Sequence, residues 1–238
     1  MSPLVIQRAL LAQGYDLGPS KADGIWGRAS IKATKLFQGD HGLKIDGVVG
    51  GETLKALGLV GALPLPAVES ASAPPMWLHE AGRLMGTREI AGAKSNPVII
   101  GWATRLGGWI AGFYKNDDTP WCGLFVAHCI GATLPDEKLP SNPLSALAWK
   151  AFGVPLAKPR LGAVAVFKRP GGGHVGFYLG EDATTVTVRG GNQSNAVTET
   201  RIPKSRLVGY RWPATVPLTG SGGPIEVASK GEISTNEA

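Results

Sequence analysis

The sequence is poor in cysteine. Of its 238 residues only Cys122 and Cys129 are cysteines, which is too few for a disulfide scaffold, so a hydrophobic core has to stabilise the fold. If the apolar run 123–130 is helical, about 10.5 Å of helical rise separates the two cysteines, beyond the roughly 7 Å that a disulfide spans between Cα atoms. We therefore expect two free thiols.

Long apolar runs are also missing. No uninterrupted stretch of about 18 apolar residues could cross a bilayer. Polar residues interrupt the first ten positions, which leaves no apolar region of the length that a secretory signal needs. We expect a soluble chain with no membrane span and no signal peptide.

Signals for metal and nucleic-acid binding are absent as well. The sequence has no H-E-x-x-H or C-x-x-C motif and its four histidines are dispersed, so we expect no metal site and no cofactor. It also has no basic helix and no aromatic RNA motif, which argues against nucleic acid as a partner. The net charge of +6 still favours an anionic partner.

What the sequence does contain is an internal repeat. Asp23–Gly27 reads Asp-Gly-Ile-Trp-Gly, and Asp46–Gly50, 23 residues later, reads Asp-Gly-Val-Val-Gly. Apolar residues at helical spacing follow each copy, and another helical stripe at residues 5–11 precedes the first. The pattern predicts a small all-α three-helix bundle over residues 1–60, with an Asp-Gly turn before each of the last two helices.

The residues around this repeat carry a resemblance. Ile6-Gln7, Gly14-Tyr15, Phe37-Gln38 and Gly42-Leu43, together with the two Asp-Gly loops, resemble the three-helix peptidoglycan-binding domain attached to many cell-wall hydrolases. The resemblance implies that residues 1–60 hold the protein on bacterial peptidoglycan and do no chemistry.

Three residues of this domain are candidates for wall binding: Trp26, Asp23 and Asp46. Trp26 could be an exposed platform for a sugar or peptide, because the second copy of the repeat has Val49 in its place. Core packing of Trp26 and turn formation by the two aspartates are the simpler interpretation.

Two segments lack helical or strand periodicity. Residues 61–75 hold four prolines among small residues and are predicted to be a semi-rigid linker. Residues 217–238 are rich in Gly, Ser, Thr and charge, without an aromatic residue, and are predicted to be a disordered tail.

Between them, residues 76–216 change pattern midway. Helical patterns occupy residues 76–84, 97–106, 121–134 and 144–151. From Gly162 onward β-rich runs bounded by Gly and Pro follow, at residues 163–167, 174–179, 185–188 and 207–211. Helices followed by a meander of strands predict an α+β domain with an antiparallel sheet.

Cys122 is the candidate nucleophile of this domain. Pro120 favours a helix start just before it, and the free N–H groups of a helix N-terminus stabilise a thiolate and lower the thiol pKa. Cys129 lies two turns deeper among apolar residues and is predicted to be a packing residue. His174 follows three glycines and opens a strand, which suits a general base.

Asn192 is the candidate that orients His174. If Gly180–Thr184 is the turn of a hairpin, an even pairing register puts Asn192 on the same face as His174. Its side-chain carbonyl could then hold the imidazole, as the third group of a triad does. Gly190-Gly191 is prone to a bulge, so Gln193 remains the alternative.

A second resemblance rests on Trp121–Val126, Leu161–Phe167, Gly173–Tyr178 and Gly190–Asn192. Over about 80–215 these motifs resemble the papain-like CHAP domains, relatives of the NlpC-type wall peptidases. The resemblance implies cleavage of an amide through a Cys122 thioester, with His174 as base and acid and Asn192 orienting it. Gly190 stands where many relatives carry an acid, and no oxyanion donor beyond the Cys122 N–H is assigned.

The layout of a wall-binding and a hydrolase domain resembles bacteriophage endolysins. It implies a monomer made in the host cytoplasm that acts on the wall after holin-type release. Cleavage of a stem-peptide or cross-link amide and N-acetylmuramoyl-L-alanine amidase activity both fit this chemistry. A non-catalytic wall-binding virion protein is an alternative of another class. A lysozyme-like Glu80 and Glu89 pair and calcium at Asp117-Asp118 have weaker support.

Overall fold

The chain divides into two units, each with its own hydrophobic core. The computed structural model describes residues 2–19, 21–59, 74–92, 94–218, 222–227 and 233–234. The first unit spans residues 1–76 and the second residues 77–238. Most of the predicted linker, residues 61–73, lies outside the described residues.

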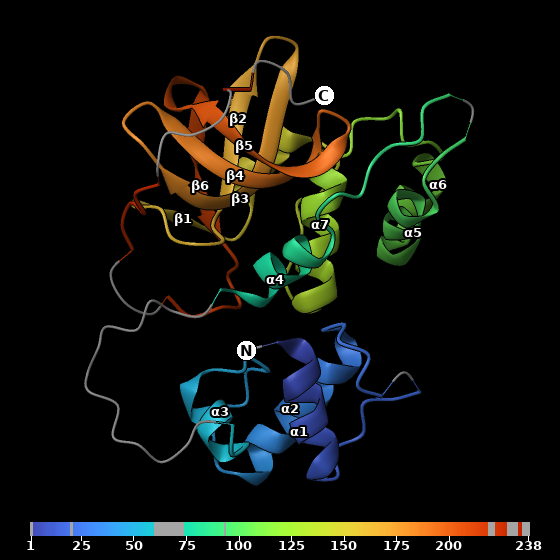
Figure 1. The fold of residues 1–238 in the computed structure, drawn as a ribbon, viewed down its shortest axis with the longest axis vertical. Coiled ribbons are helices and arrows are strands. Elements are labelled where there is room, and N and C mark those ends of the chain that lie inside the picture. The colour runs from blue at the N-terminus through green and yellow to red at the C-terminus, as the bar shows by residue number, and fades with distance from the viewer. Residues whose placement is uncertain are drawn as a thin grey trace. The chain divides into compact units, whose positions relative to one another are not determined.

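The first unit is the predicted group of three helices (Figure 1). They are α1 (Pro3–Ala12), α2 (Arg28–Asp40) and α3 (Gly51–Ala56). Gly14 follows α1 with a φ of 86°, a left-handed conformation that glycine adopts without strain. The core is formed by apolar side chains of the helices and the connecting loops, namely Ile6, Leu10, Leu17, Trp26, Ile31, Ala33, Phe37 and Leu57.

The internal repeat corresponds to two equivalent hydrogen-bond networks around buried glutamines. Gln7 Nε2 donates to Asp23 Oδ1, the Ile25 carbonyl and Ser30 Oγ at 2.8–3.0 Å, and Gln7 Oε1 accepts from the Gly24 N–H. Each glutamine connects its own helix to the next Asp-Gly loop and to the start of the helix after that loop. These bonds give a partner to backbone groups that would otherwise be buried without one.

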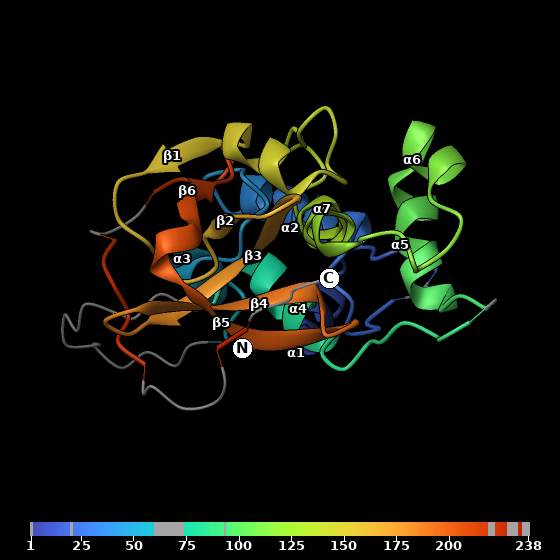
Figure 2. The same cartoon turned by 90° about the horizontal axis from the view of Figure 1, so that it is seen from above.

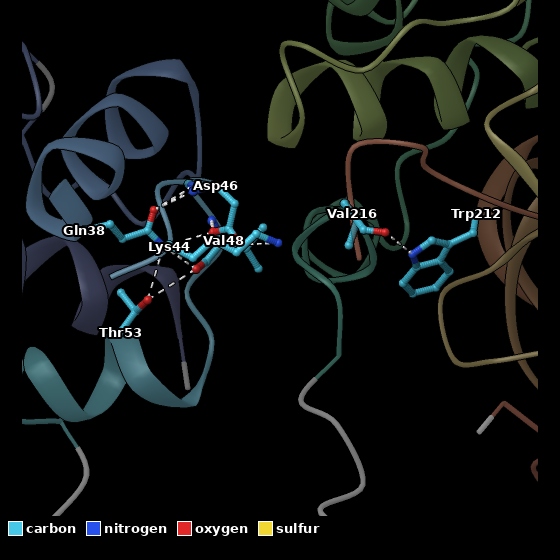
Figure 3. A network of polar contacts seen from close by, with 8 residues as sticks. Gln38, Lys44, Asp46, Val48, Thr53, Trp212 and Val216 are labelled. Atoms are coloured by element: carbon cyan, nitrogen blue, oxygen red, sulfur yellow. Dashed lines mark hydrogen bonds and ion pairs between the residues drawn. The ribbon is translucent and has the colours of Figure 1, made fainter. Parts of the chain in front are cut away.

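Gln38 repeats this arrangement in the second network (Figure 3). Its Nε2 donates to Asp46 Oδ1, the Val48 carbonyl and Thr53 Oγ1, and its Oε1 accepts from the Gly47 N–H at 2.7 Å. The partners in the two loops are offset by 23 residues, as the sequence repeat is. The repeat is therefore explained by internal hydrogen bonding.

The second unit is an α+β fold with one antiparallel sheet, as predicted. Its helical elements are α4 (Met76–Arg83), α5 (Pro97–Leu106), α6 (Gly108–Phe113), α7 (Cys122–Thr133) and the short 3-10 segments η1 (Ala146–Ala151) and η2 (Lys204–Arg206). Its strands are β1 (Val154–Leu156), β2 (Val164–Arg169), β3 (Gly172–Glu181), β4 (Thr185–Gln193), β5 (Ala196–Pro203) and β6 (Leu207–Trp212). They lie in the order β1-β6-β2-β3-β4-β5.

Helix α7 is the centre of this unit. Figure 2 shows it nearly end-on, with the sheet on one side and α5 on the other. Because both sides are covered, α7 is apolar almost all round, and Leu124, Phe125 and Ile130 are fully buried. The helix N-terminus therefore starts inside the protein, beside β3 and β4.

Part of the predicted disordered tail makes regular hydrogen bonds with the sheet. The Glu181 N–H donates to the Ile225 carbonyl and the Val227 N–H to the Glu181 carbonyl, at 2.8 and 3.1 Å. Ser234 N–H donates to the Arg201 carbonyl. Residues 222–227 and 233–234 thus differ from the prediction, because their backbone groups bond to the end of β3 that extends past β2 and to the outer edge of β5.

A buried polar cluster connects α4 to α7. Glu80 accepts hydrogen bonds from Arg83 at 2.7 and 2.9 Å and lies 3.1 Å from Nε2 of His128, whose ring stacks on Trp102. Burial raises the pKa of Glu80, but the hydrogen bonds from Arg83 and His128 outweigh it and lower the pKa to about 2. Burial lowers the pKa of His128, against the opposing effect of Glu80.

We expect the buried cluster around Glu80 to make the protein less stable in acid. The Glu80 carboxyl has a pKa of about 2 in the folded state, against an ordinary value of 4.5. Its ionised form therefore stabilises the folded protein above pH 4.5, and this contribution is lost as the pH falls toward 2. We expect Glu80→Gln to lower the free energy of unfolding at pH 7 by about 3 kcal/mol and to flatten its dependence on pH between 4.5 and 2. Denaturant titrations across this range measure both effects.

Glu199→Gln is the matched control, because its carboxylate forms a more exposed ion pair with Arg189. That substitution is expected to cost less than about 1 kcal/mol. An equal loss in both variants would contradict a special role for the buried cluster.

Candidate active site

Cys122 is the first residue of α7 and lies against the strand that carries His174. Its side chain is 6% exposed. The backbone N–H groups of Val175, Gly123 and Cys122 itself act on the thiol in the direction that lowers its pKa. Val175 directly follows His174 in β3, so the fold brings together two residues that are 52 positions apart in the sequence.

The pKa of the Cys122 thiol is raised, not lowered as the helix start predicts. Burial is the dominant cause. The three N–H groups and the positive charge of Arg169 oppose burial without overcoming it. The sequence indicates the helix N-terminus but not the depth at which it lies, so the prediction had the wrong sign. A base is needed to remove the thiol proton at neutral pH.

His174 is fully buried and its Nε2 lies 3.0 Å from Oε1 of Gln193. Gln193 Nε2 donates to the Thr198 carbonyl at 2.6 Å and to Thr198 Oγ1 at 3.1 Å, which directs the amide oxygen toward the imidazole. An amide oxygen only accepts. His174 Nε2 therefore carries a proton in this pair, and Nδ1 is the basic nitrogen of the neutral ring.

Asn192 does not have the orienting contact that the sequence predicts; Gln193 makes it. The β3–β4 pairing of Phe177 with Arg189 would, if continued, put Asn192 opposite His174. The pairing of β4 with β5 instead shifts between Gly190 and Gln193, and Asn192 has a φ of 56°. This bulge breaks the alternation of side chains, so the next residue faces the imidazole.

Gly190 and Gly191, where the bulge begins, let the neighbouring side chains pack closely around the site. A Cβ on Gly190 would come within 3.1 Å of His174 Nε2 and also collide with Gln193, and one on Gly191 would lie 2.6 Å from Trp121 and Phe125. The consecutive glycines are thus needed for close approach of β4 to β3 and α7. The glycine pair was the sequence signal for the bulge. It did not indicate whether the bulge would turn Asn192 or Gln193 toward His174.

Cys129 is fully buried in the core, and burial, followed by the charge of Glu80, raises its pKa well above the ordinary value. It lies on α7 with Leu124, Phe125 and Ile130 as core neighbours. The structure gives this thiol an apolar packing environment.

The acidic alternatives have structural contacts. Glu80 belongs to the buried cluster with Arg83, and Glu89 accepts from the Trp121 indole N–H at 2.6 Å. Asp117 Oδ2 accepts from the backbone N–H groups of Ile90 and Asn96. Within the described parts of the chain, no group of three or more His, Cys, Asp or Glu residues is arranged to hold a metal ion.

The three wall-binding candidates of the first unit have internal roles. Trp26 is 3% exposed in the core, which agrees with the core-packing interpretation and not with the exposed platform. Asp23 and Asp46 each accept from Gln7 or Gln38 and from an N–H in their own loop, at 2.8–3.0 Å. The structure accounts for both aspartates through turn formation.

Comparisons with known proteins concern the first unit. The family model of a putative peptidoglycan binding domain matches residues 4–57. N-acetylmuramoyl-L-alanine amidase CwlL of Bacillus licheniformis is 37% identical over 57 residues, which cover 24% of this chain and 16% of that protein. No solved structure matches the chain.

Over the residues that the structure describes, no helix is long and apolar enough to span a bilayer. The matched segment coincides with the three helices and both glutamine networks of the first unit. Residues 4–57 are a peptidoglycan-binding domain.

Proposed function

We propose that this chain is a peptidoglycan hydrolase whose second unit cleaves an amide bond of the stem peptide or cross-link. Cys122 is the nucleophile, His174 the general base and acid, and Gln193 the residue that orients the imidazole. One observation carries the proposal: α7, which begins with Cys122, packs against β3, which carries His174, and His174 Nε2 lies 3.0 Å from Gln193 Oε1. This is the order of nucleophile, base and orienting group in thiol hydrolases.

The reaction follows from the protonation states. The Cys122 sulfur attacks the amide carbonyl carbon while its proton passes to Nδ1 of His174. The C–N bond then breaks and the imidazolium gives this proton to the leaving amine, which leaves a thioester. Water attacks the thioester with His174 again taking the proton, and this proton returns to sulfur as the carboxylic acid departs.

The start of α7 supplies donors for the tetrahedral oxyanion. Cys122 and Gly123 are the first two residues of α7, whose backbone N–H groups have no partner within the helix, and an oxyanion formed on the attacked carbon lies next to the Cys122 sulfur. Such preorganised donors stabilise the developing charge in a site from which water is excluded. Both residues are buried.

The substrate is inferred from the first unit. A domain that binds peptidoglycan keeps the second unit at a high local concentration of wall amides. Both peptide cleavage and N-acetylmuramoyl-L-alanine amidase activity fit the thiol mechanism. We propose that the enzyme is a monomer and that its second unit is papain-like, of the CHAP or NlpC type. It would act in the cell wall after release from the host cytoplasm, as endolysins do.

Digestion of purified wall sacculi tests this function. We expect new amino groups and no new reducing sugar, with iodoacetamide blocking the release and EDTA leaving it unchanged. Mass spectrometry of the soluble fragments identifies the amide that is cut. Binding to sacculi without release of any fragment would instead favour a non-catalytic wall-binding protein.

A further inference from the structure

The hairpin that carries His174 also carries an arginine, Arg169. Arg169 is the last residue of β2 and pairs with Gly172 of β3, while Phe167 pairs with His174. The positive charge of Arg169 acts on the Cys122 thiol and partly offsets the effect of burial on its pKa. Arg169 lies two residues after Phe167, so its side chain is on the same face of the sheet as that of His174.

Arg169 has no anionic partner within the described ranges of the chain. Its Nε is buried and has no hydrogen-bond partner there. Three other arginines of this unit form ion pairs: Arg83 with Glu80, Arg189 with Glu199 and Arg201 with Asp182, at 2.6–2.7 Å. A partly buried cation without an anion costs free energy, which a ligand of opposite charge recovers on binding.

The turn beside Arg169 leaves room for such a ligand. A Cβ built on Gly171 or Gly172 would meet no heavy atom within 4 Å. The next residue, Gly173, is crowded by Leu147 and by the Phe167 carbonyl. The hairpin is thus open at its tip, next to Arg169, and closed toward His174.

We propose that Arg169 is a specificity-determining residue that binds a free carboxylate of the peptide substrate and so positions the amide next to Cys122. This inference rests on the proposed function. A guanidinium offers a planar fork of donors that matches a carboxylate, and peptidoglycan stem peptides carry free carboxylates that amidation converts to neutral carboxamides. The enzyme would accordingly prefer stem peptides that are not amidated.

Binding to the full-length Cys122→Ala protein tests the proposal without turnover. The probes are a synthetic L-Ala-γ-D-Glu-L-Lys tripeptide and its fully amidated counterpart, measured by titration calorimetry. We expect the carboxylate peptide to bind about 10- to 100-fold more tightly than the carboxamide. Adding Arg169→Gln should bring this ratio close to one, and Arg169→Lys should give an intermediate ratio because it keeps the charge and loses the fork.

Lys168→Gln is the matched control, because Lys168 is the exposed neighbour of Arg169 on the same strand, and it should leave the ratio unchanged. An unchanged ratio in Arg169→Gln would overturn the inference, as would an equal weakening of both peptides, which indicates a structural effect. These outcomes are separate from a failure of the proposed function, which would appear as wild-type product release by Cys122→Ala.

Discussion

Replacing Cys122 with alanine is expected to lower the release of amino groups from peptidoglycan by about 10⁴-fold or more, because removal of the nucleophile eliminates the thioester route. The variant should still bind wall sacculi, since the binding domain occupies residues 4–57. Initial rates on sacculi, together with a sedimentation assay for binding, separate the two effects.

Cys129→Ala is the matched control for this experiment. It removes the other thiol of the same helix, which is fully buried, and it is expected to cost about 1 kcal/mol of stability while leaving the rate within a few-fold of the wild type. Full activity in Cys122→Ala would end the proposed mechanism. Loss of activity in both variants at a temperature where both are folded would also contradict the assignment of one nucleophile.

Gln193→Leu is expected to have the second largest effect, a fall in kcat of about 10² to 10⁴-fold with KM little changed. The leucine removes the acceptor for His174 Nε2, so the imidazole loses the contact that fixes its tautomer and orientation. Gln193→Glu keeps an acceptor at the same length and should recover part of the rate. Steady-state kinetics on a soluble stem peptide measures these effects.

The variant Asn192→Gly tests whether Asn192 or Gln193 orients His174. Glycine adopts the φ of 56° found at Asn192 without strain, so the bulge should persist and kcat should stay within a few-fold of the wild type. Asn192→Ala is a poorer control because alanine is strained in this conformation. A loss in Asn192→Gly as large as that in Gln193→Leu would return the orienting role to Asn192.

The difference between Asn192 and Gln193 shows where sequence reasoning reaches its limit. Alternation along a strand predicts which residues share a face only while the pairing is regular. The shift between Gly190 and Gln193 inserts an irregularity, and one extra residue exchanges the two faces. The glycine pair signals that a bulge can form, but only the packing of Gly191 against Trp121 determines its position.

The pKa of Cys122 shows a second limit. The helix start was predictable from Pro120 and the apolar run, and the structure begins α7 at Cys122. Whether a helix start is exposed or buried depends on what packs around it. Here β3, β4 and α5 cover the helix, so desolvation exceeds the stabilisation by N–H groups.

In the first unit the sequence repeat was visible, but its physical cause was not. The repeat predicted two similar loops, and a glutamine precedes each of them in the sequence, at Gln7 and Gln38. The bonding of each glutamine to an Asp-Gly loop required three dimensions to see. Burial of Trp26 likewise follows from helix packing, which a comparison of the two repeat copies does not contain.

By itself, the sequence determined the features that depend on neighbouring residues: the three helices of a peptidoglycan-binding domain, the order of helices before an antiparallel sheet, and the candidates Cys122 and His174. Periodicity, turn residues and helix-start signals are local, so they can be read along the chain. Tertiary structure decided the partner of His174, the protonation of Cys122, the burial of Trp26 and, among the residues that the structure describes, the lack of an anionic partner for Arg169. Each of these depends on contacts between distant segments and on the loss of water around them, which no local pattern encodes.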